Sequence, residues 1–176
     1  MHYNKLLIYT YIEKFDASFI TNLPKKISLI YRNYEKTNIN EILKIYKLCK
    51  KIKRKIFISN NIKLAIKLNT NGVYIPSFNN NLNIKYFKFK KNFELIGSAH
   101  TYREIKIKKL QNVDKIFLSP IFENEKTKKS LGIYKFLHLK KYAKKEVICL
   151  GGIKKQNLPK IKMIKPAGFA SISLFR

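Results

Sequence analysis

Two glycines and two serines near the end of the chain combine the features of a phosphate-binding site. Gly151 and Gly152 directly follow an apolar run, so backbone N–H groups there approach a ligand closely. Ser171 and Ser173 lie in and just after the next such run, where they would add hydroxyl and amide donors. The alternative is that the glycines only form a tight turn before a helix that begins near Gln156. Their position after two successive predicted strands favours the phosphate site.

Three other segments carry side chains suited to proton transfer or anion binding. His100 follows a third apolar run, where an imidazole suits acid–base catalysis, although it could instead cap the helix that follows. Arg32 suits bidentate anion binding, with a solvated surface arginine as the alternative. Thr127 and Lys128 lie in a loop of mixed charge over residues 123–130, which predicts either a lid over an anion or a solvated loop.

Several enzyme classes are excluded by motifs that the sequence lacks. No HExxH, GxxxxGKS, GxGxxG or Ser/His/Asp signature occurs, which argues against a zinc protease, a P-loop NTPase and a Rossmann oxidoreductase. Cys49 and Cys149 are the only 2 cysteines and lie far apart, so neither a disulfide framework nor a CxxC site is available, and we expect a cytoplasmic protein. The apolar run Leu6–Ile12 is too short to span a membrane, so no membrane partner is expected.

Short apolar, β-branched or aromatic runs are predicted to be the strands that position these residues. They are Leu6–Tyr11, Ile27–Tyr31, Lys55–Ser59, Gly72–Ile75, Phe93–Ile96, Lys115–Leu118, Val147–Leu150 and Gly168–Ile172. Most intervals hold a segment with helical periodicity, clearest in Glu41–Lys50, Ile62–Leu68, Tyr102–Leu110 and Tyr134–Lys144. Strand followed by helix, repeated along the chain, predicts parallel pairing through right-handed crossovers. We therefore expect an α/β fold, a compact (β/α)₈ TIM barrel, with an open doubly wound sheet as the main alternative.

The expected barrel is compressed and its outer layer is incomplete. A typical barrel takes about 250 residues, whereas here residues 1–176 are expected to form a single barrel domain. The first crossover, Glu13–Lys26, is short and contains Pro24, and no final outer helix is expected after the last strand. Apolar strand faces that lack a helix need another cover, which predicts a homodimer.

The net charge of +28, from 38 basic and 10 acidic residues, would normally indicate a polyanionic partner. Arginine, which recognition of bases and phosphates favours, is rare, and lysine occurs together with abundant Asn, Ile, Tyr and Phe, as AT-rich coding produces. The lysines are spread over the chain and are densest at Lys47–Lys55. Coding bias is the favoured explanation, so we expect only non-specific contact with nucleic acid. The 45% of hydrophobic residues exclude a disordered basic tail.

Seven short segments occur in an order and at a spacing that resemble a known family. They are residues 27–32, 58–65, 71–75, 96–101, 119–122, 150–153 and 168–173. Over nearly the whole chain they resemble the thiamine phosphate synthase and TenI family, which implies a (β/α)₈ barrel acting on thiazole phosphate and hydroxymethylpyrimidine pyrophosphate. The resemblance assigns thiazole phosphate to Gly151, Gly152, Ser171 and Ser173, and acid–base catalysis to His100. It implies substrate or pyrophosphate contacts for Arg32, Asn60, Asn79, Ser98, Thr127 and Lys128.

The sequence departs from the synthase pattern where the family holds its metal. Asn60 and Asn79 stand where the synthases hold Mg²⁺ with aspartates, so we assign no metal ligand and expect Mg²⁺ only in a working synthase. Tyr34 replaces a lysine of the pyrophosphate half. Because His100 matches the TenI branch, whose members isomerise a thiazole carboxylate phosphate by proton transfer, the sequence favours a tautomerase. The alternatives are a divergent thiamine phosphate synthase and a catalytically inactive basic binding or regulatory barrel.

Overall fold

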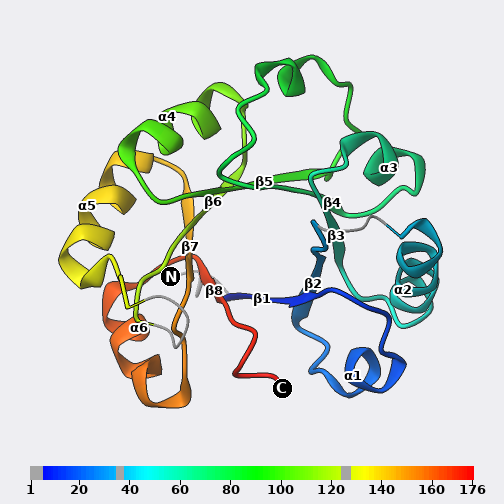
Figure 1. The fold of residues 1–176 in the computed structure, drawn as a ribbon, viewed down its shortest axis with the longest axis horizontal. Coiled ribbons are helices and arrows are strands. Elements are labelled where there is room, and N and C mark those ends of the chain that lie inside the picture. The colour runs from blue at the N-terminus through cyan, green and yellow to red at the C-terminus, as the bar shows by residue number, and fades with distance from the viewer. Residues whose placement is uncertain (1–5, 35–37, 124–127) are drawn as a thin grey trace.

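The computed structural model describes residues 6–34, 38–123 and 128–176, and its strands close into a barrel. All neighbouring strands are parallel and follow one another in chain order, and the last pairs with the first (Figure 1). The strands are β1 (Leu7–Ile12), β2 (Ile27–Tyr31), β3 (Ile56–Ser59), β4 (Gly72–Ile75), β5 (Glu94–Ala99), β6 (Lys115–Leu118), β7 (Glu146–Leu150) and β8 (Gly168–Ala170). The expected (β/α)₈ fold is confirmed, and the open doubly wound sheet is excluded.

The apolar runs identified the strands because parallel barrel strands are buried on both faces and therefore need no alternating polar residues. The predicted bounds of β2, β4 and β6 agree with the structure at both ends. β8 is shorter than predicted and ends at Ala170 instead of Ile172. The reason is that the Ser171 hydroxyl accepts the backbone N–H of Leu174 at 3.2 Å, which turns the chain out of the strand.

Helices surround most of the barrel, and α2 to α5 lie where the helical periodicity predicted them. They are α1 (Ala17–Asn22), α2 (Ile39–Lys51), α3 (Ile62–Lys67), α4 (Tyr102–Leu110), α5 (Gly132–Ala143) and α6 (Leu158–Ile164), with the 3₁₀ helices η1 (Leu82–Tyr86) and η2 (Lys155–Asn157). The first crossover is short, as expected, because α1 has only 6 residues. The connection from β4 to β5 forms only η1 among its described residues.

The structured chain after β8 takes the place of a final outer helix. Within residues 171–176, all of which the structure describes, no helix forms, as expected. Instead Phe175 stacks on Phe169 of β8, with ring centroids 6.5 Å apart and planes 13° from parallel. The segment therefore covers part of the outer face of β8 that a helix would cover in a complete barrel.

Two apolar layers stabilise the barrel. The inner layer fills the barrel itself and is rich in aromatic residues, which meet edge to face; it comprises Tyr9, Tyr11, Ile30, Phe57, Tyr74, Ile96, Phe117, Ile148 and Ala170. The outer layer lies between the strands and the helices and contains both cysteines, which are free and buried. Burial raises the pKa of the Cys49 thiol to about 11. The barrel is thus a packed core, and chemistry is confined to its rim.

Arg54 ties the short first crossover to the barrel. Its side chain is only 6% exposed, and its guanidinium donates to three backbone carbonyls, Leu23 O at 2.6 Å, Pro24 O at 2.9 Å and Ile27 O at 2.8 Å. These carbonyls lie between the end of α1 and the first residue of β2, and Pro24 O also accepts the backbone N–H of Ile27 at 3.0 Å. Arg54 therefore adds side-chain donors that fix the connection between the short helix and the barrel.

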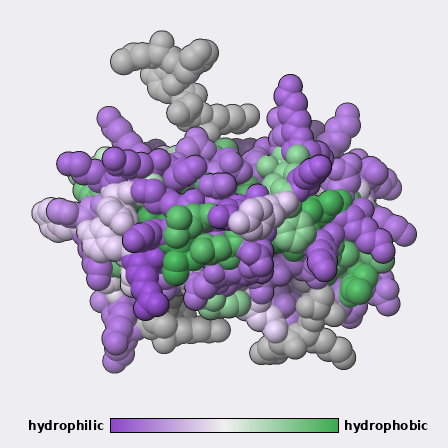
Figure 2. Space-filling view, turned by 90° about the horizontal axis from the view of Figure 1, so that it is seen from above, coloured by the Kyte–Doolittle hydropathy of each residue, from purple (hydrophilic) through white to green (hydrophobic). Residues whose placement is uncertain are grey.

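The outer surface is predominantly hydrophilic. On the face shown in Figure 2, hydrophobic residues form patches near the middle and hydrophilic residues surround them. Among the described residues no helix is both long and apolar enough to cross a bilayer.

Two lysines bind one carboxylate at the N-terminal ends of the strands. Lys115 and Lys55 contact Glu94 at 2.5 and 2.9 Å. Burial of Glu94 opposes its ionisation, but the hydrogen bonds from the two lysines hold its pKa below the usual value.

Candidate active site

Polar residues gather at the mouth of the barrel, where the strands end. On β2, β3, β5 and β6, each inward position that follows the apolar inner layer is polar, since residues two apart in a strand share a face. These positions are Arg32, Ser59, Ser98 and Ser119. Barrel enzymes place their active sites at this end of the strands, so the mouth is the candidate active site.

Gly151 and Gly152, which follow β7, make a turn that no other residue type accommodates. Their φ angles are +94° and +66°, in the left-handed region. A Cβ atom on Gly151 would lie 2.6 Å from the Cβ of Pro120, and one on Gly152 would lie 2.4 Å from the carbonyl oxygen of Glu123. The turn also contacts the loop after β6, because the Phe122 N–H donates to Gly151 O at 3.2 Å. The glycines are therefore needed both for the tight turn and for the close packing of this loop against it. Their binding of phosphate stays a prediction.

The two serines after β7 and β8 differ in their environments. Ser171 is buried, and its hydroxyl donates to Ile153 O at 3.0 Å while accepting from Leu174 N, so it holds the glycine turn against the end of β8. Ser173 is exposed two residues further on. Asn157 also fixes the turn, since its amide donates to Gly152 O at 2.7 Å. Ser173 is therefore the serine whose side chain faces solvent beside the turn.

His100 directly follows β5, and its imidazole hydrogen-bonds to Ser119. Its Nδ1 lies 2.7 Å from the Ser119 carbonyl oxygen and 3.1 Å from the Ser119 hydroxyl. A carbonyl oxygen only accepts hydrogen bonds, so Nδ1 is the donor to Ser119 O. The alternative that His100 caps the helix is wrong, because the Thr101 hydroxyl caps α4 by accepting Glu104 N at 3.2 Å. The imidazole is available for proton transfer.

The structure brings Asn60 and Asn79 together. Asn60 follows β3 in the left-handed conformation, with a φ of +57°, and Asn79 lies in the loop after β4. The Asn79 side-chain amide donates to Asn60 Oδ1 at 2.6 Å, and Asn79 Oδ1 accepts the backbone N–H of Asn81 at 2.9 Å. These two residues, far apart in sequence, thus form one neutral amide pair on the rim.

Arg32 follows β2, the strand next to β3, and its guanidinium packs on an aromatic ring. Its guanidinium carbon is 4.3 Å from the centre of the Tyr11 ring, a cation–π contact that orients the fork. Nearby, the Ser59 hydroxyl and the Tyr34 hydroxyl are 3.2 Å apart, and the Tyr34 ring meets Phe78 edge to face. This part of the mouth therefore combines one fixed cation with aromatic rings.

For the other predicted site residues, the described part of the chain gives burial but no contact with another site residue. Ser98 is buried on β5 at an inward position of the mouth, and Lys128 is exposed. Thr127 lies outside the described residues. Sequence reasoning missed Ser119 as the partner of His100 and Tyr11 as the support of Arg32. The alternation of inward and outward positions along β1 and β6 is the signal that could have found both.

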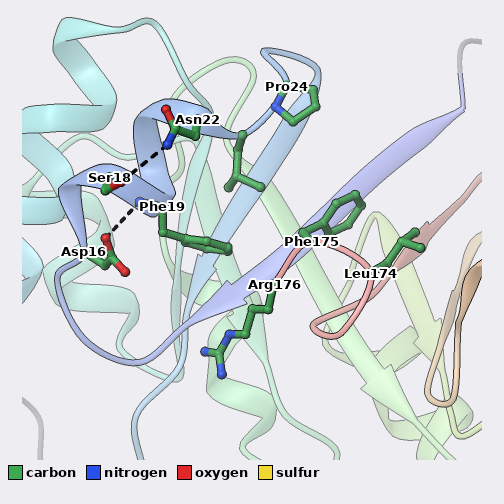
Figure 3. A pocket seen from close by; sticks show the side chains of 9 residues that line it. Asp16, Ser18, Phe19, Asn22, Pro24, Leu174, Phe175 and Arg176 are labelled. Carbon is green, nitrogen blue, oxygen red and sulfur yellow. Dashed lines mark hydrogen bonds between the residues drawn. The ribbon is translucent and has the colours of Figure 1, made fainter.

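A groove of about 590 Å³ lies on the flank of the barrel, and none of the predicted site residues lines it. Figure 3 shows it between α1, which contributes Asp16, Phe19 and Asn22, and the final segment with Phe175 and Arg176. Asp16 caps α1 by accepting Phe19 N at 2.8 Å. The groove therefore lies between the first crossover and the segment that follows β8.

Comparison with known proteins relates this barrel to enzymes of one kind. The family model described as thiamine monophosphate synthase matches residues 23–175. A thiamine-phosphate synthase of Pelagibacter ubique (strain HTCC1062) is 32% identical over 159 residues, covering 85% of this chain and 74% of the relative. A thiamine-phosphate synthase of Prochlorococcus marinus (strain AS9601) is 28% identical over 145 residues, which cover 80% of this chain and 40% of that protein.

Solved structures agree on the fold. Thiamine phosphate pyrophosphorylase from Pyrococcus furiosus superposes with a TM-score of 0.77 at 17% identity, covering 97% of this chain and 87% of the other. The protein of that name from Bacteroides thetaiotaomicron gives a TM-score of 0.64 at 23% identity, with coverages of 96% and 83%. The expected resemblance is confirmed by the family model and the first relative together. This chain belongs to the thiamine monophosphate synthase family.

Proposed function

We propose that this protein is a thiamine phosphate synthase, which joins hydroxymethylpyrimidine pyrophosphate to thiazole phosphate. The observation that carries the proposal is the similarity of this chain to two curated relatives with the synthase name. The contact of 2.6 Å between Asn79 and Asn60 joins the two residues to which the resemblance assigns the positions of the family's metal ligands. The tautomerase favoured by the sequence alone becomes the second candidate.

The mouth divides into two halves that suit the two substrates. The turn at Gly151 and Gly152, with Ser173 beside it, suits the phosphate of the thiazole. Arg32 suits the pyrophosphate, with Lys128 and Thr127 of the β6 loop as further contacts, and Ser98 lies between the halves on β5. Joining the substrates forms a bond to the pyrimidine-bearing carbon and breaks its bond to a pyrophosphate oxygen. Pyrophosphate leaves with the electron pair, so the cationic half stabilises the charge that develops.

The family implies Mg²⁺, and the residues present do not fit a protein-held Mg²⁺ ion. Mg²⁺ prefers carboxylates together with phosphates, whereas Asn60 and Asn79 offer neutral amides. Each amide oxygen already accepts a hydrogen bond. Among the described residues, no cluster of three or more His, Cys, Asp or Glu side chains is placed to hold a metal. In the proposed reaction the neutralising charge therefore comes from Arg32 and the lysines.

A coupling assay tests the proposal. The purified protein is mixed with both substrates, with and without MgCl₂, and thiamine phosphate and pyrophosphate are measured. We expect both products in equal amounts and in proportion to the enzyme. Arg32→Ala should raise the KM for the pyrophosphate substrate and leave the KM for thiazole phosphate unchanged, whereas Arg103→Ala, on the exposed face of α4, should change neither. No product with either metal condition would reject the synthase.

The geometry of His100 favours thiazole tautomerisation as the second candidate. Its Nδ1 donates to Ser119 O, so Nε2 is the ring nitrogen assigned to act as the base. His100→Ala should abolish proton exchange on a thiazole carboxylate phosphate while coupling persists. Loss of both activities in a folded His100→Ala protein would mean that one site serves both reactions.

The homodimer expected from the incomplete outer layer is also a proposal. The groove between α1 and the final segment, lined by Phe19, Leu174 and Phe175, supplies partly apolar surface there. Sedimentation equilibrium should give twice the mass of the chain. The Phe175→Asp variant should give the mass of a single chain. A monomeric wild-type protein at micromolar concentration would reject the dimer.

A further inference from the structure

A lysine and a glutamine on α4 are buried although most of that helix's polar residues face solvent. Lys108 and Gln111 have no exposed surface. Both donate to backbone carbonyls of the loop after β4, the interval in which only the short η1 forms. The pair therefore links the end of α4 to this loop.

Every side-chain donor of the pair forms a hydrogen bond, and four of the five bonds go to that loop. The Lys108 ammonium donates to Pro76 O and Asn79 O, both at 2.8 Å, and to Gln111 Oε1 at 2.9 Å. The Gln111 amide donates to Asn79 O at 2.9 Å and Asn81 O at 3.0 Å. The two residues thus fix three carbonyls of residues 76–81, and Asn79 receives two of the bonds.

The neighbouring strand leaves room for this arrangement. A Cβ atom on Gly97 of β5 would lie 2.8 Å from Lys108 Cδ, so any larger residue would displace the lysine stem. Burial lowers the pKa of Lys108 to about 8 although the Glu104 carboxylate on the same helix opposes that shift. An apolar side chain of this length would avoid the desolvation of a cation, but it would also remove the donor that Pro76 O and Asn79 O receive from this position. The lysine is therefore explained by the hydrogen bonds that it makes to the loop.

We infer that Lys108 and Gln111 are positioning residues for the pyrophosphate half of the site. They hold the loop of residues 76–81 so that the Asn79 amide meets Asn60, and neither touches the substrates. The inference rests on the proposed synthase for its effect on catalysis. The arrangement of the loop itself is independent of that proposal.

Two variants separate positioning from charge. Lys108→Met keeps the length of the side chain and removes its donors. Gln111→Glu is milder, because its carboxylate still accepts from Lys108 but no longer donates to Asn79 O and Asn81 O. Lys106→Met is the matched control, since Lys106 is exposed on the same helix. All three are compared with the wild type by circular dichroism before use.

The first readout is hydrogen exchange of the amides in residues 76–81, which needs no substrate. In both variants these amides should exchange about tenfold faster than in the wild type, or faster still. In the Lys106→Met control their exchange rates should stay unchanged. The second readout is coupling kinetics. The KM for hydroxymethylpyrimidine pyrophosphate should rise by about tenfold, while the KM for thiazole phosphate stays unchanged.

The outcomes separate this inference from the proposed function. Faster exchange without any coupling activity in the wild type would support the positioning role and reject the synthase. Unchanged exchange, or equal effects on both KM values, would overturn the inference. An effect of Lys108→Met without one of Gln111→Glu would also overturn it, because only the charge would then matter.

Discussion

Restoring carboxylates at the amide pair should create a Mg²⁺ site where the structure has none. In an Asn60→Asp, Asn79→Asp protein both side chains lose their donors, and two charges would stand about as close as the amide atoms, which are 2.6 Å apart. In a water-like dielectric such charges repel by about 1.6 kcal/mol. The backbone should not resist, because Asp, like Asn, tolerates the left-handed φ of +57° at position 60.

Thermal unfolding measures both parts of this prediction. Without metal, the double variant should lose about 3 to 6 °C in Tm, the shift that 1.6 kcal/mol causes in a chain of this size. Mg²⁺ at ten times its Kd should return about 1.4 kcal/mol and most of that loss. The wild type should respond little to Mg²⁺ over the same range.

The single variant Asn60→Asp is the control. Its carboxylate still accepts from the Asn79 amide, so the loss of Tm should be small. If the double variant gains no more stability from Mg²⁺ than the wild type does, the pair does not stand at a metal position and the argument about the family's aspartates fails here.

Four further outcomes are expected. Arg54→Met should lower the free energy of unfolding in urea by about 2 to 4 kcal/mol, since it removes three hydrogen bonds to backbone carbonyls, and exposed Arg103→Met should change it by less than about 0.5 kcal/mol. Gly152→Ala, strained at a φ of +66°, should raise the KM for thiazole phosphate more than that for the pyrophosphate substrate; an unchanged KM would remove the turn from the phosphate site. Burial lowers the folded pKa of Lys108 to about 8, below its unfolded value, so the unfolded chain binds more protons above pH 8 and stability should rise with pH; relative to Lys108→Met, the wild type should gain about 1 to 2 kcal/mol between pH 7.5 and 9.5 in urea titrations. On heparin the protein should elute at modest salt with no preference among DNA sequences, whereas a steep salt dependence with sequence discrimination would favour the basic binding barrel.

The strands were predictable because burial on both faces produces a local sequence pattern, a continuous apolar run. A strand such as Gly72–Ile75 is buried on both faces, so its apolar run stands out from a lysine-rich background. The end of β8 has no such pattern. Ile172 continues the run, and only the hydrogen bond of the Ser171 hydroxyl, set by the approach of another segment, ends the strand earlier.

Site residues were predictable in position more than in environment. The strand ends located Arg32, His100, Asn60 and Asn79 at the mouth, because topology brings all strand ends to one rim. The contact of Asn79 with Asn60 depends on the path of the loop after β4. That path depends on Lys108, and nothing in the sequence separates this buried lysine from its exposed neighbours.

The three residues of β8 form the two ladders that close the barrel. Gly168–Ala170 pairs with both β7 and β1, and Gly168 lies so close to Leu7 that a Cβ atom would be 2.1 Å from the Leu7 carbonyl oxygen. During synthesis β1 and β7 therefore keep open hydrogen-bonding edges until residue 170 has left the ribosome. Such edges are templates for pairing with other chains. A substitution that displaces these three residues should consequently expose two edges together and favour aggregation.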